Sequence, residues 1–262
     1  MMQSIPSTND ELVLYNWPTS TCSQKVRLVL AEKSLRFEDR RLDSSKSENL
    51  SDWYLKLNEN GVVPTLTHGQ RVIIDSSVIA EYLDEVFPAS PLSPSDPYKR
   101  ARMRIWRQFI DEVPTPAIRV PSYNRYIRHK WKNMSEEAFS KLVEKRTVRK
   151  HFYRNMGLEG SSQEEENQAI EKLRETVNRM ERSLTENPWV SGEQFTLADI
   201  ALIPTLVRMS DIGLGHVWND KPHVAAWFER VQARPSFTQT FYPGSRYGAE
   251  GSHPALESLP AC

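Results

Sequence analysis

The sequence predicts an α/β domain followed by an all-helical domain, on three observations. Short β-prone runs occur only before residue 75. A stretch at 87–97 then holds four prolines and three serines, a composition typical of connecting segments. Beyond it, helical periodicity replaces the β signals. We therefore expect a mixed domain at 10–86, a linker at 87–96, a helical domain at 97–242 and a weakly ordered tail at 243–262.

The first domain is expected to run β-α-β-α-β-β-α, a mixed sheet with helices on its faces. Gly69 suits the tight turn of a hairpin, and Asp75 with Ser76 offers N-cap chemistry for the helix that follows. The predicted strands are 12–15, 36–42 (polar, at an edge), 65–68 and 71–74, and the predicted helices begin near residues 20, 51 and 76.

The second domain shows the start and stop signals of several helices. Asp96 and Pro97 suit the cap and first position of a long helix, which Pro114 and Pro116 disrupt. Thr196 with Asp199 resembles a capping box, to which we assign a structural role worth about 1 kcal/mol. Further helices are predicted from Ser135 and over 164–184, 222–231 and 235–241.

Composition excludes several classes of function. Lys+Arg and Asp+Glu balance at 34 each, which argues against an electrostatic nucleic-acid binder. Two cysteines, Cys22 and Cys262, give no disulfide framework and indicate a reducing compartment. Without a signal-peptide pattern or an apolar run of about 18 residues, a soluble cytoplasmic protein with no membrane partner is expected. The histidines show no metal-ligand spacing, so no metal is expected.

Two stretches carry groups suited to chemistry on a thiol peptide. Val63 precedes a proline and is held extended, so its backbone N–H and C=O can pair with a peptide main chain. Asp75 and Ser76 at a helix N-terminus could receive that peptide's charged ends. A plain hairpin-to-helix corner is the alternative.

The second stretch lies at the start of the first helix. A hydroxyl there can donate to a thiolate and favour its ionised form, with Ser20 the first choice as donor and Thr21 the second. These hydroxyls could equally act as caps alone. Cys22 is either itself a low-pKa thiolate or a small residue of the first turn.

The motif VPTL, a hairpin and then DSSVIAEYL resembles the glutathione-binding half of the glutathione S-transferases. The resemblance implies a thioredoxin-like first domain, glutathione as co-substrate and a homodimer. It further implies that Pro64 is a cis-proline, that Val63 pairs with the cysteinyl main chain, and that Asp75 and Ser76 bind the γ-glutamyl group. Val62 departs from the polar residue that many relatives have there.

Two branches of that family share further motifs with this chain. STCSQKVRL resembles both the zeta-like isomerases, where the serine contacts glutathione, and the tetrachlorohydroquinone dehalogenases, where the cysteine is catalytic. SDWYLKLNENGVVPTL, EYLDEVFPASPLSPSDPYKRARMR and NMSEEAFSKLVEKR are similar to the bacterial glutathione-dependent β-etherases. These resemblances imply thiolate attack on an aryl ether, in detoxification or aromatic catabolism. Dehalogenation or isomerisation through Ser20 and Cys22, or a non-catalytic ligand-binding or stress-response protein, are the alternatives.

The second substrate is expected between the first helix and the helical domain. The segment 116–131 mixes aromatic and cationic residues, which would suit an arene bearing an anionic or phenolic group. A solvated helix face is the alternative. The expected contacts are Trp17, Arg119, Tyr123 and Tyr126.

A charge pattern supports the homodimer. The helix after the linker carries a basic run from Lys99 to Arg107, and the helix before it carries Glu81, Asp84 and Glu85. A two-fold pairing of these helices would place opposite charges across the interface.

Overall fold

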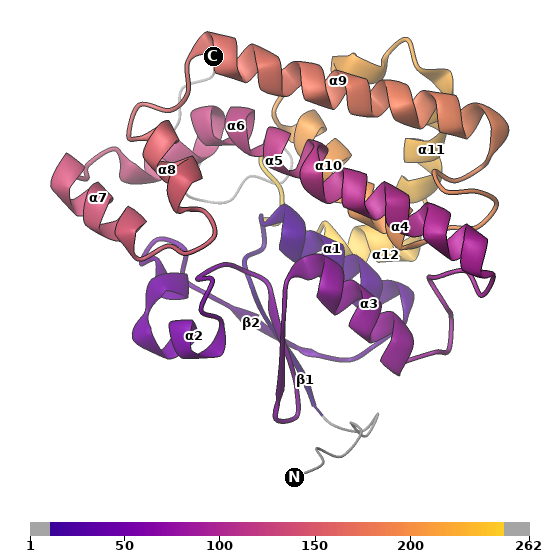
Figure 1. Cartoon of the computed structure of the whole chain (residues 1–262), viewed down its shortest axis with the longest axis horizontal. Helices are drawn as coiled ribbons and strands as arrows, with labels where there is room; N and C mark the ends of the chain where they lie inside the picture. The colour runs from indigo at the N-terminus through magenta and orange to yellow at the C-terminus, as the bar shows by residue number, and fades with distance from the viewer. Residues whose placement is uncertain (1–10, 249–262) are drawn as a thin grey trace.

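The computed structural model describes residues 11–248. A four-stranded sheet with three α-helices occupies the chain before residue 87, and the chain from residue 97 onward is helical (Figure 1). The predicted fold class is confirmed: a small mixed, thioredoxin-like domain precedes a helical domain.

The sheet has the order β2-β1-β3-β4. The strand β1 (Leu12–Asn16) lies at its centre, parallel to β2 (Glu38–Arg41) and antiparallel to β3 (Thr65–His68). β3 forms a hairpin with β4 (Arg71–Ile74). All four residues of β2 are exposed, as expected for a polar edge strand.

The helices of the first domain place the start of its first helix at the domain boundary. α1 (Thr21–Glu32) packs against α3 (Ser76–Val86), and both face the helical domain, whereas α2 (Asp52–Leu57) lies apart from them beside the 3-10 helix η1 (Glu48–Leu50) (Figure 1). α1 also contacts two helices of the second domain, α10 (Leu197–Asp211) and α12 (Pro235–Thr240). One apolar core therefore runs from the sheet into the helical domain.

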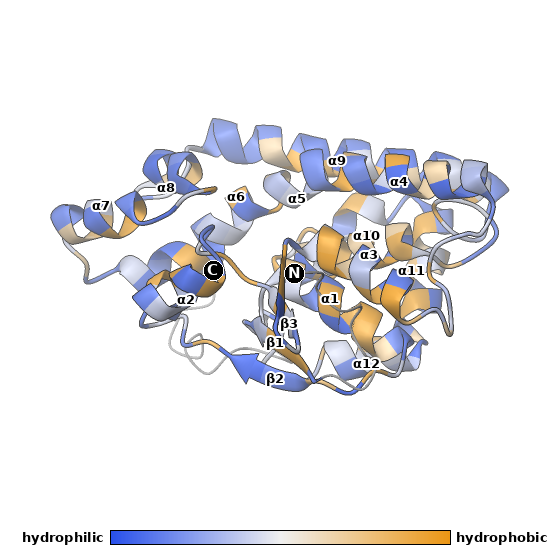
Figure 2. Ribbon diagram, turned by 60° about the horizontal axis from the view of Figure 1, so that its bottom comes forward, coloured by the Kyte–Doolittle hydropathy of each residue, from blue (hydrophilic) through white to orange (hydrophobic). Residues whose placement is uncertain are grey.

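The second domain contains more helical segments than the sequence signals indicate. α8 and the short segments after Ala117 lacked start signals of their own. Figure 2 shows that α4 and α9 turn hydrophilic faces outward. No helix within residues 11–248 is both long and apolar enough to cross a membrane. The segments are α4 (Pro97–Glu112), α5 (Pro114–Ala117), α6 (Arg119–Ser122), η2 (Tyr123–Ile127), η3 (Arg128–Trp131), α7 (Glu136–Glu144), α8 (Lys150–Met156), α9 (Gln163–Glu186), α10 (Leu197–Asp211), η4 (Gly215–Trp218), α11 (Pro222–Gln232) and α12 (Pro235–Thr240).

α10 is the central helix of the second domain, and its predicted cap is a buried network. Asp199 accepts hydrogen bonds from the Thr196 N–H (3.0 Å), the Val190 N–H (3.0 Å) and the Trp227 indole (2.9 Å). Burial raises the pKa of Asp199 to about 6, although these donors oppose the rise. The structural role assigned to this motif is therefore confirmed, and it extends beyond a local cap.

The proline-rich connection at 87–96 is fastened at its middle. Lys33 forms a buried ion pair with Asp84 (2.8 Å) and donates to the carbonyl of Ser90 (3.0 Å). Asp84 also accepts from the Leu92 N–H (2.8 Å), and the Leu92 carbonyl accepts from the Leu197 N–H (3.0 Å). These bonds tie the two domains together because they join α1, α3 and the start of α10.

The expectation of a weakly ordered tail from residue 243 is wrong for 243–248. The Ser245 carbonyl accepts from Gln24 (2.8 Å), and Arg246 forms an ion pair with Asp211 (2.6 Å). Tyr247 is buried and stacks on Tyr126, with ring centroids 4.5 Å apart. The composition of this segment, rich in Gly, Pro and Ser, did not indicate these contacts, because individual residues make them and no periodic pattern accompanies them. The rest of the predicted tail lies outside the described residues.

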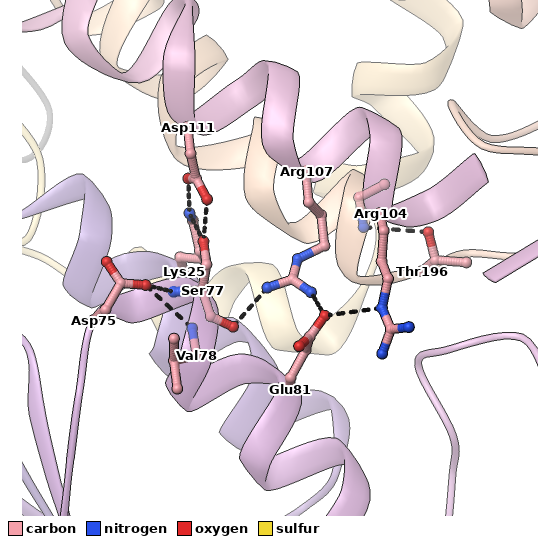
Figure 3. A network of polar contacts seen from close by, with 10 residues as sticks. Lys25, Asp75, Ser77, Val78, Glu81, Arg104, Arg107, Asp111 and Thr196 are labelled. Carbon is pink, nitrogen blue, oxygen red and sulfur yellow. Dashed lines mark hydrogen bonds and ion pairs between the residues drawn. The ribbon is translucent and has the colours of Figure 1, made fainter. Parts of the chain in front are cut away.

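The charge pattern invoked for a dimer is used within one chain instead. Arg107 pairs with Glu81, and Arg104 lies 3.5 Å from the same carboxylate (Figure 3). Asp84 pairs with Lys33 on α1. Because α3 and α4 belong to one molecule and are neighbours, these opposite charges meet intramolecularly. The use of Glu81 and Asp84 within one chain weakens the electrostatic argument for a two-fold interface, which stays a prediction.

Candidate active site

The start of α1 presents two hydroxyls and a thiol at the domain boundary. Ser20 is the N-cap, and its Oγ accepts a hydrogen bond from the Ser23 N–H (3.2 Å). Its own proton thus stays available to an acceptor in the cleft, so capping and donation are compatible in this residue. Thr21 and Cys22 occupy the first turn of the helix.

The turn before β3 has the backbone expected for peptide pairing. The Val63–Pro64 peptide bond is cis. Tyr54 (2.8 Å) and Asn58 (3.0 Å) both donate to the carbonyl of Val62, and so fix the backbone just before Val63. Within residues 11–248, no hydrogen bond reaches the N–H or the carbonyl of Val63. Those two groups are therefore available to an added extended peptide.

Asp75 caps α3 in an unusual backbone conformation. Its φ is 71°, and its Oδ1 accepts from the N–H groups of Ser77 (2.8 Å) and Val78 (3.1 Å) (Figure 3). A non-glycine residue at positive φ costs roughly 1–3 kcal/mol, and such strain concentrates at functional sites. The carboxylate is exposed and its Oδ2 is not used by the cap, so it can still accept from an ammonium group.

A cleft opens between the start of α1 and the helical domain. Its non-atom space measures about 820 Å³, the open solvent at its mouth included. The predicted residues Trp17, Ser20, Thr21, Cys22 and Arg119 line it together. Residues that the sequence reasoning missed also line it, namely Lys130, Trp131, Arg146, Arg149, Tyr153, Arg208 and Tyr247.

Cys22 connects this cleft to the cap of α3. The side chain of Ser76, the first residue of α3, favours the ionised form of the Cys22 thiol and so lowers its pKa. Burial raises the pKa of Cys22, but the positive charges of Arg149, Lys25 and Arg119 together with the Ser76 side chain outweigh it, so the net shift is downward. The thiol is therefore predisposed to ionise, as reactive cysteines are.

Two predicted substrate contacts lie elsewhere. Tyr123 is fully buried in a second apolar cluster, and its hydroxyl donates to the Gly157 carbonyl (2.6 Å). Tyr126 does not line the cleft but supports Tyr247, which does. Neither side chain lines the cleft, because the segment 119–131 consists of short α, π and 3-10 turns. A regular helical period therefore predicts wrongly which side chains of this segment face the cleft.

The missed residues left few signals in the sequence. Arg146 and Arg149 belong to the connection between α7 and α8, where residues 145–150 hold four cations and no carboxylate. Such a run can indicate an anion site, although a solvated loop gives the same pattern. Tyr247 had no local signal, since its place in the cleft depends on the fold of the whole second domain.

Comparisons with known proteins agree with this geometry. Residues 14–91 match the family model "Glutathione S-transferase, N-terminal domain", and residues 159–230 match "Glutathione S-transferase, C-terminal domain". Protein LigF from Sphingobium sp. strain SYK-6 is 33% identical over 90% of this chain and 95% of its own length. Its crystal structure, titled as a beta-etherase, superposes with a TM-score of 0.80, at 32% identity, over 88% of this chain and 98% of that one.

A second relative represents the alternative chemistry. The tetrachloro-p-hydroquinone reductive dehalogenase of Sphingobium chlorophenolicum is 28% identical over 87% of this chain and 94% of its own length. The match to LigF, above 30% identity over nearly both whole chains, and the two family models at the expected places decide the family. The chain belongs to the glutathione S-transferase family, whose co-substrate is glutathione.

Proposed function

We propose that this protein ionises the thiol of bound glutathione and directs it at an aromatic electrophile, preferably the carbon of a β-aryl ether. The observation that carries the proposal is Ser20, whose Oγ caps α1 and whose hydroxyl donates no hydrogen bond within residues 11–248. A hydrogen bond to a thiolate lowers its pKa. The similarity to a beta-etherase supports the choice of electrophile.

The remaining predicted residues would hold the peptide. Val63 would pair with the cysteinyl main chain next to the cis Pro64, and Asp75 with Ser76 would receive the γ-glutamyl group. Glutathione sulfur then attacks the carbon that bears the aryl ether and a C–S bond forms. The bond between that carbon and the ether oxygen breaks, and the phenolate leaves with the electron pair. Holding both reactants in the cleft supplies much of the rate by proximity.

The second candidate is reductive dehalogenation or isomerisation through Cys22. The lowered pKa of this thiol and its place in the cleft favour it, as does the similarity to the dehalogenase. In that route Cys22 attacks the sulfur of a glutathione conjugate, forms a mixed disulfide with glutathione, and releases the reduced arene.

Substitutions at positions 20 and 22 separate the two routes. In the etherase route, Ser20→Ala should raise the pKa of bound glutathione and slow phenol release about ten- to a hundredfold. Ser20→Thr, which keeps a hydroxyl, should retain most activity, and Cys22→Ala should stay near wild type. The measurements are phenol release from a model β-aryl ether and ultraviolet absorbance of the bound thiolate against pH.

Activity that survives Ser20→Ala but stops after one step in Cys22→Ala, with a trapped glutathione conjugate by mass spectrometry, would favour the second candidate. No turnover by any of these proteins would favour a ligand-binding role.

We also propose a cytoplasmic homodimer, with an apolar rather than a charged interface. Val78 on α3 and Tyr98 and Ile105 on α4 are 54%, 74% and 58% exposed. Apolar residues gathered on two neighbouring helices support contact with a second copy.

A further inference from the structure

The cleft wall is strongly cationic. Arg119, Lys130, Arg146, Arg149 and Arg208 all line it, and no aspartate or glutamate of the described chain does. The protein as a whole carries equal numbers of acidic and basic residues, so this imbalance is local. A concave surface lined by one sign of charge concentrates ligands of the opposite sign.

The arginines at 119, 146 and 149 have no carboxylate partner. Within residues 11–248 none of the three forms an ion pair. Arg146 is 5% exposed and lies over the Tyr153 ring at 3.8 Å, yet its Nε has no hydrogen-bond partner. Buried donors are rarely left unsatisfied unless a ligand completes them.

Charges of the same sign also oppose one another here. Burial and the neighbouring positive charge of Arg149 lower the pKa of Arg119 to about 10. The thiolate of Cys22 interacts with both arginines, and Asp111, which already pairs with Lys25, also acts on Arg119. One thiolate cannot balance three guanidinium groups, so positive charge remains for an incoming anion.

We propose that Arg119, Arg146 and Arg149 bind a carboxylate carried by the aromatic substrate. A guanidinium presents a planar fork that matches a carboxylate, and Trp17, Trp131, Tyr153 and Tyr247 supply ring surfaces for the arene. The proposal names the class of the second substrate, an aryl acid. It rests on the proposed function, which takes this cleft to be the reaction site.

The carboxylates of glutathione are a second source of the same chemistry. The three arginines all come from the helical domain, on α6 and on the connection from α7 to α8. The groups available to glutathione, at residues 63 and 75–76, come from the sheet domain. This separation assigns the arginines to the second substrate, and the experiment distinguishes the two sources.

The test compares two probes of nearly the same shape, the anionic para-nitrobenzoate and the neutral para-nitrobenzamide. Titration into the full-length protein, followed by quenching of tryptophan fluorescence and by calorimetry, needs no turnover. Wild type should bind the acid at least about tenfold more tightly than the amide, since hydrogen bonds to a charged group contribute roughly 1.5–3 kcal/mol. Arg149→Gln, at a partly exposed position that avoids a folding defect, should remove most of that preference, as should Arg119→Gln.

Arg154→Gln is the matched control. Arg154 lies on α8, pairs with Glu144 on the surface and does not line the cleft, so this variant should keep the wild-type preference. Equal affinity of wild type for the two probes, or a preference that persists in Arg119→Gln/Arg149→Gln, would overturn the proposal. So would a loss of glutathione affinity with unchanged para-nitrobenzoate affinity, which would assign the arginines to glutathione. Absence of ether cleavage would defeat the proposed function alone, because acid binding is measured separately.

Discussion

Two cationic clusters border the domain boundary, and they differ in their compensation. Where α3 meets α4, Arg107 pairs with Glu81 and Lys25 pairs with Asp111 at 2.9 Å (Figure 3). In the cleft, Arg119, Arg146 and Arg149 have no carboxylate among the described residues. The first cluster satisfies itself, whereas the second needs an anion from outside.

This difference shows how a neutral chain can hold a charged site. Breaking a buried ion pair strands a charge and is strongly destabilising. A buried cation that was never paired lowers the stability of the free protein instead, and is retained where a ligand completes it. The paired cluster should therefore respond to substitution through stability, and the unpaired cluster through binding.

The largest expected effect is at the paired cluster. Glu81→Ala removes the carboxylate shared by Arg107 and Arg104. The Arg107 side chain, 8% exposed, loses its ion pair and keeps only its hydrogen bond to the Ser77 carbonyl. We expect a loss of about 3 kcal/mol in the free energy of unfolding, measured by chemical denaturation. Glu85→Ala, an exposed acidic residue on the same helix, should change it by less than about 0.5 kcal/mol. Equal losses in the two variants would remove the contrast between buried and surface carboxylates.

A smaller effect of opposite sign is expected at the unpaired cluster. In a Cys22→Ala background, where no thiolate offsets the positive charges, Arg149→Gln relieves repulsion with Arg119. The free energy of unfolding should rise by about 0.5–1 kcal/mol. The rise should shrink at high salt, which screens the repulsion. A loss of stability comparable to that of Glu81→Ala would mean that Arg149 is structurally paired after all.

The smallest expected effect is on the ionisation of Cys22. Arg149 is the strongest of the charges that lower the pKa of this thiol, so Arg149→Gln should raise that pKa toward its ordinary value. A lowered thiol pKa favours the thiolate and hence reaction at lower pH. Alkylation of Cys22 by iodoacetamide should therefore shift to higher pH in the variant, as followed by mass spectrometry of the peptide that contains Cys22. An unshifted pH profile, matching that of the Arg154→Gln control, would show that Arg149 does not act on this thiol.

The sequence by itself determined the features that depend on neighbouring residues. Ser20 as a cap and Asp199 as the acid of a capping box follow from hydrogen bonds that span about three residues. The hairpin around Gly69 and the stop at Pro114 follow from backbone geometry. The extended valine before Pro64 and the cap at Asp75 were found for the same reason, and the resemblance to a family supplied the cis bond.

Only the tertiary structure decided which side chains meet. Arg146 and Arg149 line the same cleft as Cys22, although more than a hundred residues of chain separate them from it. Tyr247, which follows the last helix, lines the cleft. Tyr123 lies in the second apolar cluster instead, because its segment forms a π-turn rather than a regular α-helix. Periodicity and composition report on a residue's immediate neighbours, but burial, pairing and the sign of a local field depend on distant parts of the chain, which the fold alone brings together.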